Sequence, residues 1–353
     1  MLRIQRHHLD AVHGAGEASE LWPAVQSAIE LEHATIPPYL TALLSIKQGY
    51  NVAAARIIGS VVREEMLHMA IACNLLNALG GTPRIDDPAF LPKYPGALPM
   101  GVRSELTVGL EKLTRRVVHG VFMSIEEPED PIDIPVRAAL GSAEAVAIPE
   151  NATIGQFYAA ISEKLVEWEN GGKNPIVGDP KRQIADPDWY PEKQLFPIHS
   201  VTDAVRAIDV IVEQGEGTST SPLDASGEVA HFYRFGEIVY GKTIVAVPTP
   251  PGWAYAGTPV ALDPAGVWDL LSDAKAVDFP ETTRARVLVD LFNTAYTNLL
   301  RCLDRVFNGE PGQLEMALSV MVEMQLTGQK LVTTPVPGTG KYAAPTFEYT
   351  PFS

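Results

Sequence analysis

The sequence predicts an all-α fold: a four-helix bundle with a long irregular insertion and an additional C-terminal helix pair. Long runs with apolar residues at helical spacing, short connections between them and polar residues inside their apolar faces support this prediction. We expect residues 1–353 to form a single domain whose bundle core comprises residues 18–80 and 153–242. Residues 81–152 are then the irregular excursion, and residues 283–332 are the C-terminal pair.

Composition and charge exclude several classes of function. The net charge of −16 argues against nucleic acid as a partner and against anionic membrane surfaces. No run of about 18 apolar residues exists to span a membrane, and the N-terminus lacks the apolar stretch of a signal peptide. The two cysteines lie in apolar runs, as buried thiols do in a reducing compartment. We therefore expect a cytoplasmic protein.

The first predicted helix covers residues 18–36 and is kinked by Pro37 and Pro38 before a continuation to Lys47. Glu32 lies about 30° from the centre of its apolar stripe, whereas Glu30 lies more than about 100° away. The angular position around the helix therefore indicates that Glu32 is the buried carboxylate. The tetrapeptide that begins at Glu30 also has the form Glu-x-x-His, but Glu30 lies away from the apolar stripe.

The second predicted helix covers residues 54–80 and ends at a pair of glycines. Glu65 and His68 are three positions apart, so they share a helix face, and this face is the apolar one. A carboxylate buried there costs several kcal/mol unless it is paired or bound to a metal. The connection to the first helix is short, which favours an antiparallel pair with Glu32 and Glu65 at the same height.

Residues 81–152 are rich in proline and glycine and are expected to pack over the bundle. We expect a short strand at residues 117–125 and a buried core histidine, His119, within it. The acidic residues that follow are expected to be solvated; they are Glu126, Glu127, Glu129 and Asp130.

Two further bundle helices are predicted at residues 201–217 and 226–240, after a helix at residues 154–170 whose Glu163 faces away from the apolar side. Glu216 lies about 50° from the centre of its apolar stripe and Glu213 about 110° away, so Glu216 is the candidate and Glu213 its alternative. In the last helix Glu228 shares the apolar face, and Glu228-x-x-His231 repeats the pattern of Glu65-x-x-His68.

These residues form one constellation across four helices. Two helices each contribute one carboxylate, and two each contribute Glu-x-x-His, which is the arrangement of ferritin-like di-iron and di-manganese proteins. Bridging carboxylates offset the repulsion between two neighbouring divalent ions, and imidazoles complete the coordination. We therefore predict two divalent metal ions, with iron favoured and manganese or another metal as alternatives. The predicted ligands are Glu32, Glu65, His68, Glu216, Glu228 and His231, with Glu213 as the alternative to Glu216.

Several of these segments also resemble a known family. Residues 31–40, 64–69 and 213–217, together with His231-Phe232 and the tail piece 344–349, are similar to the ferritin-like domain of iminophenylpyruvate dimer synthases. Members of that family are assigned to violacein, rebeccamycin and staurosporine pathways. The resemblance implies oxidative coupling of two imines derived from an aromatic 2-oxo acid.

The resulting hypothesis is a non-haem oxidoreductase that acts on a small aromatic metabolite derived from an amino acid. The partner is then a small-molecule substrate, and a homo-oligomer is left open. The first alternative is a metal-storage or sequestering protein, although the excursion and the extra C-terminal helices do not suit a compact storage subunit. The second alternative is a bundle that has lost its metal and serves as a binding module.

Overall fold

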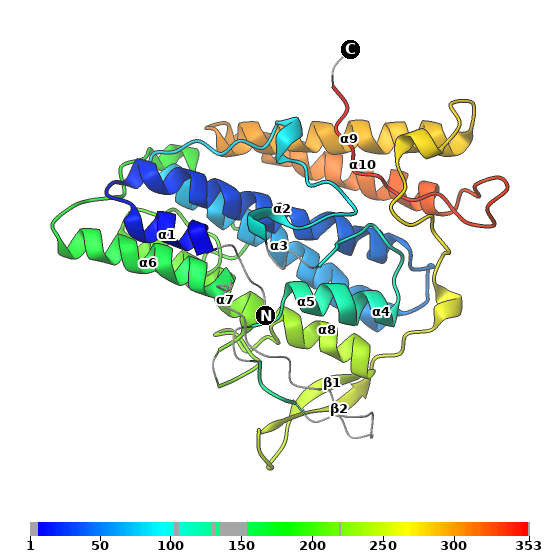
Figure 1. Cartoon of the computed structure of the whole chain (residues 1–353), viewed down its shortest axis with the longest axis horizontal. Helices are drawn as coiled ribbons and strands as arrows, with labels where there is room; N and C mark the ends of the chain where they lie inside the picture. The colour runs from blue at the N-terminus through cyan, green and yellow to red at the C-terminus, as the bar shows by residue number, and fades with distance from the viewer. Residues whose placement is uncertain (1–5, 102–105, 129–130, 135–153, 219, 352–353) are drawn as a thin grey trace.

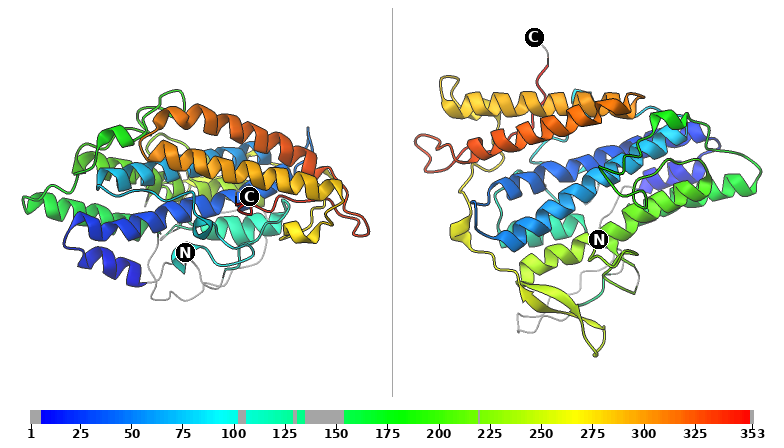
Figure 2. Two further views of the ribbon diagram at one scale, coloured as in Figure 1. Left: turned by 90° about the horizontal axis from the view of Figure 1, so that it is seen from above. Right: turned by 180° about the vertical axis from the view of Figure 1, so that it is seen from behind.

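The computed structural model describes residues 6–101, 106–128, 131–134, 154–218 and 220–351, and it is mainly helical (Figure 1). The helices α9 and α10 lie on one side of a central layer formed by α2 and α3, while α6, α7 and α8 lie on the other (Figures 1 and 2). The long helices are α1 (Arg6–Gly14), α2 (Trp22–Leu44), α3 (Val52–Ala78), α6 (Ile154–Asn170), α7 (Val201–Glu216), α8 (His231–Tyr240), α9 (Arg284–Phe307) and α10 (Leu314–Val332). This arrangement is the all-α bundle with an additional C-terminal helix pair that the sequence predicted.

The helices α2 and α3 form the expected antiparallel pair. Trp22, at the start of α2, donates its indole N–H to the carbonyl of Leu79 at the end of α3, over 2.9 Å. The helix α3 ends just before Gly80, because Gly80 adopts a left-handed conformation, φ +79°, which a side chain would disfavour. The inner faces of both helices are consequently held in one register.

One helix was predicted to kink at its two prolines, but α2 continues as one helix from Trp22 to Leu44 with both prolines inside it. A proline has no N–H, so Pro38 leaves the carbonyl of Ala34 without its helical partner. The hydroxyl of Tyr94 donates to that carbonyl over 2.6 Å. The excursion therefore replaces a hydrogen bond that the sequence removed.

The predicted strand at residues 117–125 is wrong, because this segment is helical. It consists of α4 (Arg115–Val117), a π-helical turn at Val118–Phe122 and α5 (Met123–Ile125). The side chain of Thr114 accepts the N–H of Val117 over 3.0 Å and so caps the helix start. His119 is exposed rather than buried, since Val118 and Phe122 take the inward positions of the turn.

The helix α8 begins at His231, later than predicted, because a tight loop precedes it. The carboxylate of Asp224 accepts the backbone N–H groups of Ser226 and Glu228, and Gly227 has a φ of +85°. These bonds hold the chain out of the helical conformation. After α8 an antiparallel hairpin forms from β1 (Lys242–Ala246) and β2 (Trp253–Pro259), with Ile244 opposite Tyr255.

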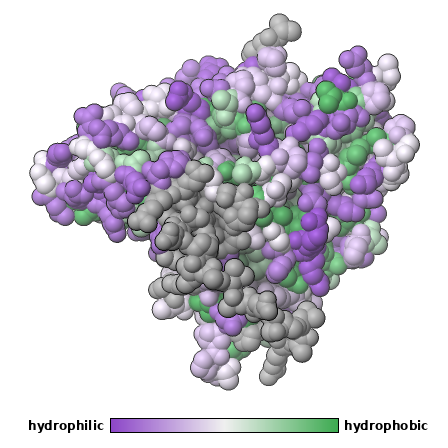
Figure 3. All heavy atoms as spheres, in the orientation of Figure 1, coloured by the Kyte–Doolittle hydropathy of each residue, from purple (hydrophilic) through white to green (hydrophobic). Residues whose placement is uncertain are grey.

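The C-terminal pair, α9 and α10, covers the outer face of α2 and α3 (Figure 2). After α10 the chain returns, and Phe347 packs edge-on against Phe292 and Tyr296 of α9 with ring centroids 5.0 and 5.1 Å apart. The face in Figure 3 is mostly hydrophilic, in keeping with the net charge. In the described ranges, no helix has the length and apolar character needed to cross a membrane.

Candidate metal centre

A cluster of acidic and imidazole side chains lies in the interior between α2, α3, α5 and α8. Glu65 and His68 are 2% exposed and His231 is fully buried. One potential ligand atom from each of these three residues lies within 4.8 Å of the others. The helical spacing of Glu65 and His68 thus leads to the shared inward face expected from the sequence.

His68 presents one ring nitrogen to the carboxylates and the other to an amide. Its Nδ1 lies 3.5 Å from Oε2 of Glu32 and 3.9 Å from Oε1 of Glu65. Its Nε2 lies 3.0 Å from the side-chain oxygen of Gln214. An amide oxygen only accepts hydrogen bonds, so Nε2 carries a proton, and Nδ1 is the ring nitrogen that faces the carboxylates.

His231 is oriented in the same way by a carboxylate. Its Nε2 lies 2.8 Å from Oε2 of Glu64, and Arg234 donates to both oxygens of Glu64 over 3.1 and 2.5 Å. Its buried Nδ1 lies 2.9 Å from Oε1 of Glu65 and 3.4 Å from Oε2 of Glu126, yet it forms no hydrogen bond. Outer partners of this kind are typical of metal-binding histidines, because they fix the tautomer and the ring orientation.

Each of the three central carboxylates is also held by a hydroxyl group. Tyr158 donates to Oε1 of Glu32 over 2.7 Å, and Thr35 donates to Oε2 of Glu65 over 2.8 Å. Tyr39 donates to Oε1 of Glu126 over 2.5 Å. In every case the second oxygen is the one that faces an imidazole. The hydroxyls therefore leave one oxygen per carboxylate directed at the centre of the cluster.

The electrostatics of the cluster favour a bound cation. Burial and then the neighbouring charge of Glu126 raise the pKa of Glu65 to about 7, although His231 acts in the opposite direction. Burial alone would lower the pKa of His231, but its contacts with Glu126, Glu64 and Glu65 raise that pKa well above the ordinary value. Carboxylates crowded in a dry interior repel one another unless positive charge lies between them.

A small cavity of about 40 Å³ borders the cluster, and Glu216 lies at its edge. Its lining includes Glu32, Glu65, His68, Glu126 and Glu216. The half-buried Glu216 accepts the N–H of Gly155 over 3.0 Å, and a Cβ on Gly155 would meet the carboxylate at 2.8 Å. Glycine at this position therefore lets α6 approach Glu216 closely.

The alternative residue, Glu213, has a different setting. It is half-buried, and its Oε2 accepts the backbone N–H of Ala225 over 2.9 Å. That bond ties α7 to the loop before α8. Of the two candidates on α7, Glu216 is the one that borders the cavity.

The predicted position of Glu228 is wrong. Glu228 was expected inside a helix and on its apolar face, but it is exposed in the loop that precedes α8. The turn at Asp224 delays the helix to His231, so the two residues do not share a helix face. His231 keeps its inward position without Glu228. The second Glu-x-x-His motif therefore does not place its two residues on one helix face.

The expectation that Glu126 is solvated is also wrong. It is 7% exposed, directly follows α5 and faces His231. The burial of Glu126 was missed because it lies in a run of acidic residues, and such a run normally indicates a solvated segment. Of the others, Glu127 is half-buried, and Glu129 and Asp130 lie outside the described residues. The apolar residues before Glu126 were the available signal, had they been interpreted at helical rather than strand spacing.

The residues present fit a divalent metal. The set combines carboxylate oxygens with imidazole nitrogens, which suits iron or manganese, and it includes no thiolate. The unbonded Nδ1 of His231, aimed at two carboxylates, is the feature that a metal would complete. The fold and this cluster together define the class: a helical bundle with an internal carboxylate–histidine centre.

Comparison with known proteins agrees with this class. A model of the ferritin-like family matches residues 25–240, a span that includes every residue of the cluster. The chain therefore belongs to the ferritin-like family. This confirms the resemblance that the sequence motifs indicated.

The chain is also similar to individual proteins. Dichlorochromopyrrolate synthase of Lentzea aerocolonigenes is 27% identical over 316 residues, which are 82% of this chain but only 29% of the relative's length. A ferritin-like protein from Caulobacter vibrioides, known from a crystal structure, has a TM-score of 0.59. That comparison covers 94% of this chain and 97% of the other at 22% identity, so it supports the fold alone.

Proposed function

We propose that the protein is a metal-dependent oxidoreductase with a dinuclear, non-haem centre, in which iron is the metal. Glu32, Glu65, His68, Glu126 and His231 would hold the ions, with Glu216 at the edge of the cavity. The observation that carries the proposal is the convergence of two imidazole Nδ1 atoms on carboxylate oxygens, with one of these nitrogens unbonded. When bound, iron supplies the ability to accept and return electrons.

The surrounding residues have defined tasks in this proposal. Gln214 and Glu64 hold a proton on Nε2 of His68 and His231, so that Nδ1 is the atom that would give up its proton and coordinate when a metal binds. The hydroxyls of Tyr158, Thr35 and Tyr39 fix the carboxylates before any ion arrives. Because the cluster is buried, bulk water is excluded and the electrostatic interactions are stronger than in solution.

We propose a small aromatic metabolite derived from an amino acid as the substrate, with oxidative coupling of two imines as the reaction. The similarity to dichlorochromopyrrolate synthase supports this substrate class, although the chain spans only 29% of that relative's length. Such a coupling forms one carbon–carbon bond and releases two electrons and two protons, which dioxygen or a peroxide would accept. The cavity of about 40 Å³ is too small for the organic substrate itself.

The metal assignment is tested by elemental analysis of protein purified without chelator. We expect about two iron ions per chain in the wild type and none in a Glu65→Ala, His68→Ala double variant. Glu228→Ala is the matched control and should keep the full content, because Glu228 is exposed and outside the cluster. Equal metal content in the wild type and the double variant would refute the site. An absorption spectrum of the same sample distinguishes non-haem iron from haem.

The reaction is tested by aerobic incubation of the iron-loaded protein with an aromatic 2-oxo acid and ammonium. Mass spectrometry should detect a product with the mass of two imines minus two hydrogens, absent with the double variant. A metal-loaded protein that forms no such product and assembles into a large cage would favour metal storage instead.

A further inference from the structure

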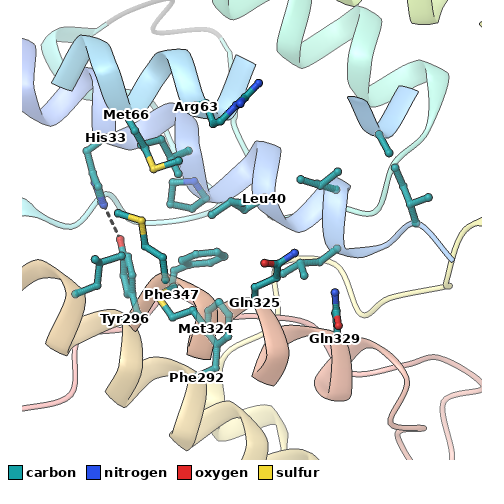
Figure 4. Close-up of a pocket in the computed structure, with 18 of the residues that line it drawn as sticks. His33, Leu40, Arg63, Met66, Phe292, Tyr296, Met324, Gln325, Gln329 and Phe347 are labelled. Atoms are coloured by element: carbon teal, nitrogen blue, oxygen red, sulfur yellow. Dashed lines mark hydrogen bonds between the residues drawn. The ribbon is translucent and has the colours of Figure 1, made fainter. Parts of the chain in front are cut away.

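A second and much larger cavity lies on the opposite side of the α2–α3 layer. It measures about 720 Å³ and lies between α2 and α3 on one side and α9 and α10 on the other, with an opening to solvent (Figure 4). The helix α2 contributes His33, Ile36 and Leu40 to this cavity, whereas its Glu32 and Thr35 face the metal cluster. The two cavities are thus separated by the thickness of a helix layer, about 8–10 Å between axes.

The walls of the large cavity are apolar and adaptable. Four of the eight methionines in the sequence line it, namely Met66, Met69, Met321 and Met324. Phe292 of α9 and Phe347 of the returning tail form one wall (Figure 4). Methionine side chains adjust to the shape of a ligand because they are unbranched and polarisable. A cavity of this volume with such walls has the properties of a binding site for an organic molecule.

The charged residues of this cavity all have the same sign. Lys47, Arg56 and Arg63 line it, and among the described lining residues there is no aspartate or glutamate. This contrasts with a chain that has 43 acidic and 27 basic residues. Arg56 and Arg63 are seven positions apart on α3, so they lie on one helix face.

The two arginines are available for a ligand. Neither of their side chains forms an ion pair or a hydrogen bond with another described residue. Lys47, by contrast, donates to the carbonyl of Ala265 over 2.9 Å and lies over the ring of Trp268. Arg63 lies at the rim near Met66, and its exposed side chain points outward from the cavity (Figure 4), so this long side chain has to fold back to contact an anionic group at the mouth.

The far end of the cavity is polar but uncharged. Nε2 of His33 lies 2.8 Å from the hydroxyl of Tyr296, at the end opposite Gln329 (Figure 4). His33 is 4% exposed, and burial lowers its pKa to about 3, so the ring is neutral. Positive charge is therefore confined to Arg56 and Arg63 on α3 and to Lys47 in the loop before it, and the interior favours an apolar body.

We propose that this cavity binds an amphipathic carboxylate, whose apolar body lies between α2 and α10 and whose carboxylate contacts Arg56 and Arg63. The volume and the flexible, largely aliphatic walls accommodate a chain longer than a single aromatic side chain. The inference does not depend on the metal centre, because the two cavities share no described lining residue. A fatty acid and an extended aromatic acid have the same chemistry at the head group, and the experiment separates them.

Binding is measured by titration calorimetry on the full chain with dodecanoate, dodecanol and 2-naphthoate, each below its aggregation concentration. We expect dodecanoate to bind at least tenfold more tightly than dodecanol. Preferential binding of 2-naphthoate would support an aromatic body instead, with the same head-group contacts. If no carboxylate binds, or if dodecanol binds as tightly as dodecanoate, the proposal is wrong.

Three variants locate the site. Arg56→Gln combined with Arg63→Gln should weaken carboxylate binding at least tenfold and leave dodecanol unchanged. Arg115→Gln, an exposed arginine elsewhere, is the matched control and should have no effect. Met324→Trp should weaken binding of both probes, because the indole ring takes up part of the apolar volume. Thermal unfolding and iron content of each variant are measured in parallel, and both should match the wild type, so that a failure of binding is distinguished from a failure of the metal proposal.

Discussion

The two cavities that flank α2 differ in almost every physical property. One is small, about 40 Å³, and is surrounded by carboxylates and imidazoles that are each fixed by a further partner. The other is about 720 Å³, with methionine and leucine walls and cations only at its rim. A single helix serves both, because residues of α2 at different angles around its axis, at a period of 3.6, face the two sides. The comparison shows that one helix layer separates a rigid polar site from an adaptable apolar cavity.

The largest expected effect comes from the outer support of the small cavity. Arg234→Leu removes the guanidinium from the half-buried carboxylate of Glu64 and leaves His231 as its partner, so we expect a loss of about 3 kcal/mol of unfolding free energy, the lower end of the range for buried pairs. Burial alone would raise the pKa of Glu64, but the contacts with His231 and Arg234 outweigh burial and lower this pKa to about 2. The carboxyl group is therefore charged at neutral pH. Chemical denaturation measures the loss. As a control, Arg286→Leu breaks an exposed pair with Asp290 and should cost less than about 1 kcal/mol. Equal losses in the two variants would show that the ion pair of Glu64 and Arg234 stabilises the fold no more than an exposed pair does.

Metal removal should have the next largest effect, and only on the small cavity. At a free metal concentration one hundred times the dissociation constant, bound metal stabilises the folded state by about 2.7 kcal/mol. A chelator should therefore lower the melting temperature of the wild type by several degrees, followed by calorimetry. The Glu65→Ala, His68→Ala variant should not respond to the chelator, and a response of similar size there would contradict the assignment.

A pH effect should arise at the large cavity through His33. The folded-state pKa of about 3 lies below the ordinary value of 6.5, so unfolding takes up a proton when the pH falls below about 6.5. Stability is therefore present above that pH and lost as the pH decreases, by about 2 kcal/mol at pH 5. His33→Phe should lack this part of the pH dependence. The test measures the unfolding free energy of the wild type and of His33→Phe between pH 7 and 5. Parallel slopes for the two proteins would refute the neutral, buried state of His33.

The smallest effect is expected where the molecule has free volume. Met324→Trp adds a large side chain beside an open cavity, so we expect it to change the unfolding free energy by less than about 1 kcal/mol. The same replacement at the fully buried Ile29 should cost at least about 1–3 kcal/mol, since no space is available there. Thermal and chemical unfolding of both variants measure this contrast. A similar cost at both positions would indicate that the large cavity is closed in solution.

The sequence predicted some residues of the candidate centre correctly and others wrongly, and the local structure around each residue explains the difference. Glu32, Glu65 and His68 lie within long helices, where the phase of the apolar stripe determines direction. Glu228 has the same local spelling, but a hydrogen-bonded turn at Asp224 delays its helix. Glu126 lies at the end of a helical segment that was expected to be a strand, in an acidic run that normally indicates solvent exposure.

Local periodicity by itself determined the all-α class and the inward residues of α2 and α3, because helical phase is a property of neighbouring positions along one chain. Only the tertiary structure decided that Glu126 joins the cluster, that Gln214 and Glu64 orient its histidines, and that a large cavity remains behind α2. These features depend on how separate elements dock. No sequence spacing encodes the distance between two helices whose packing is set by all their side chains together.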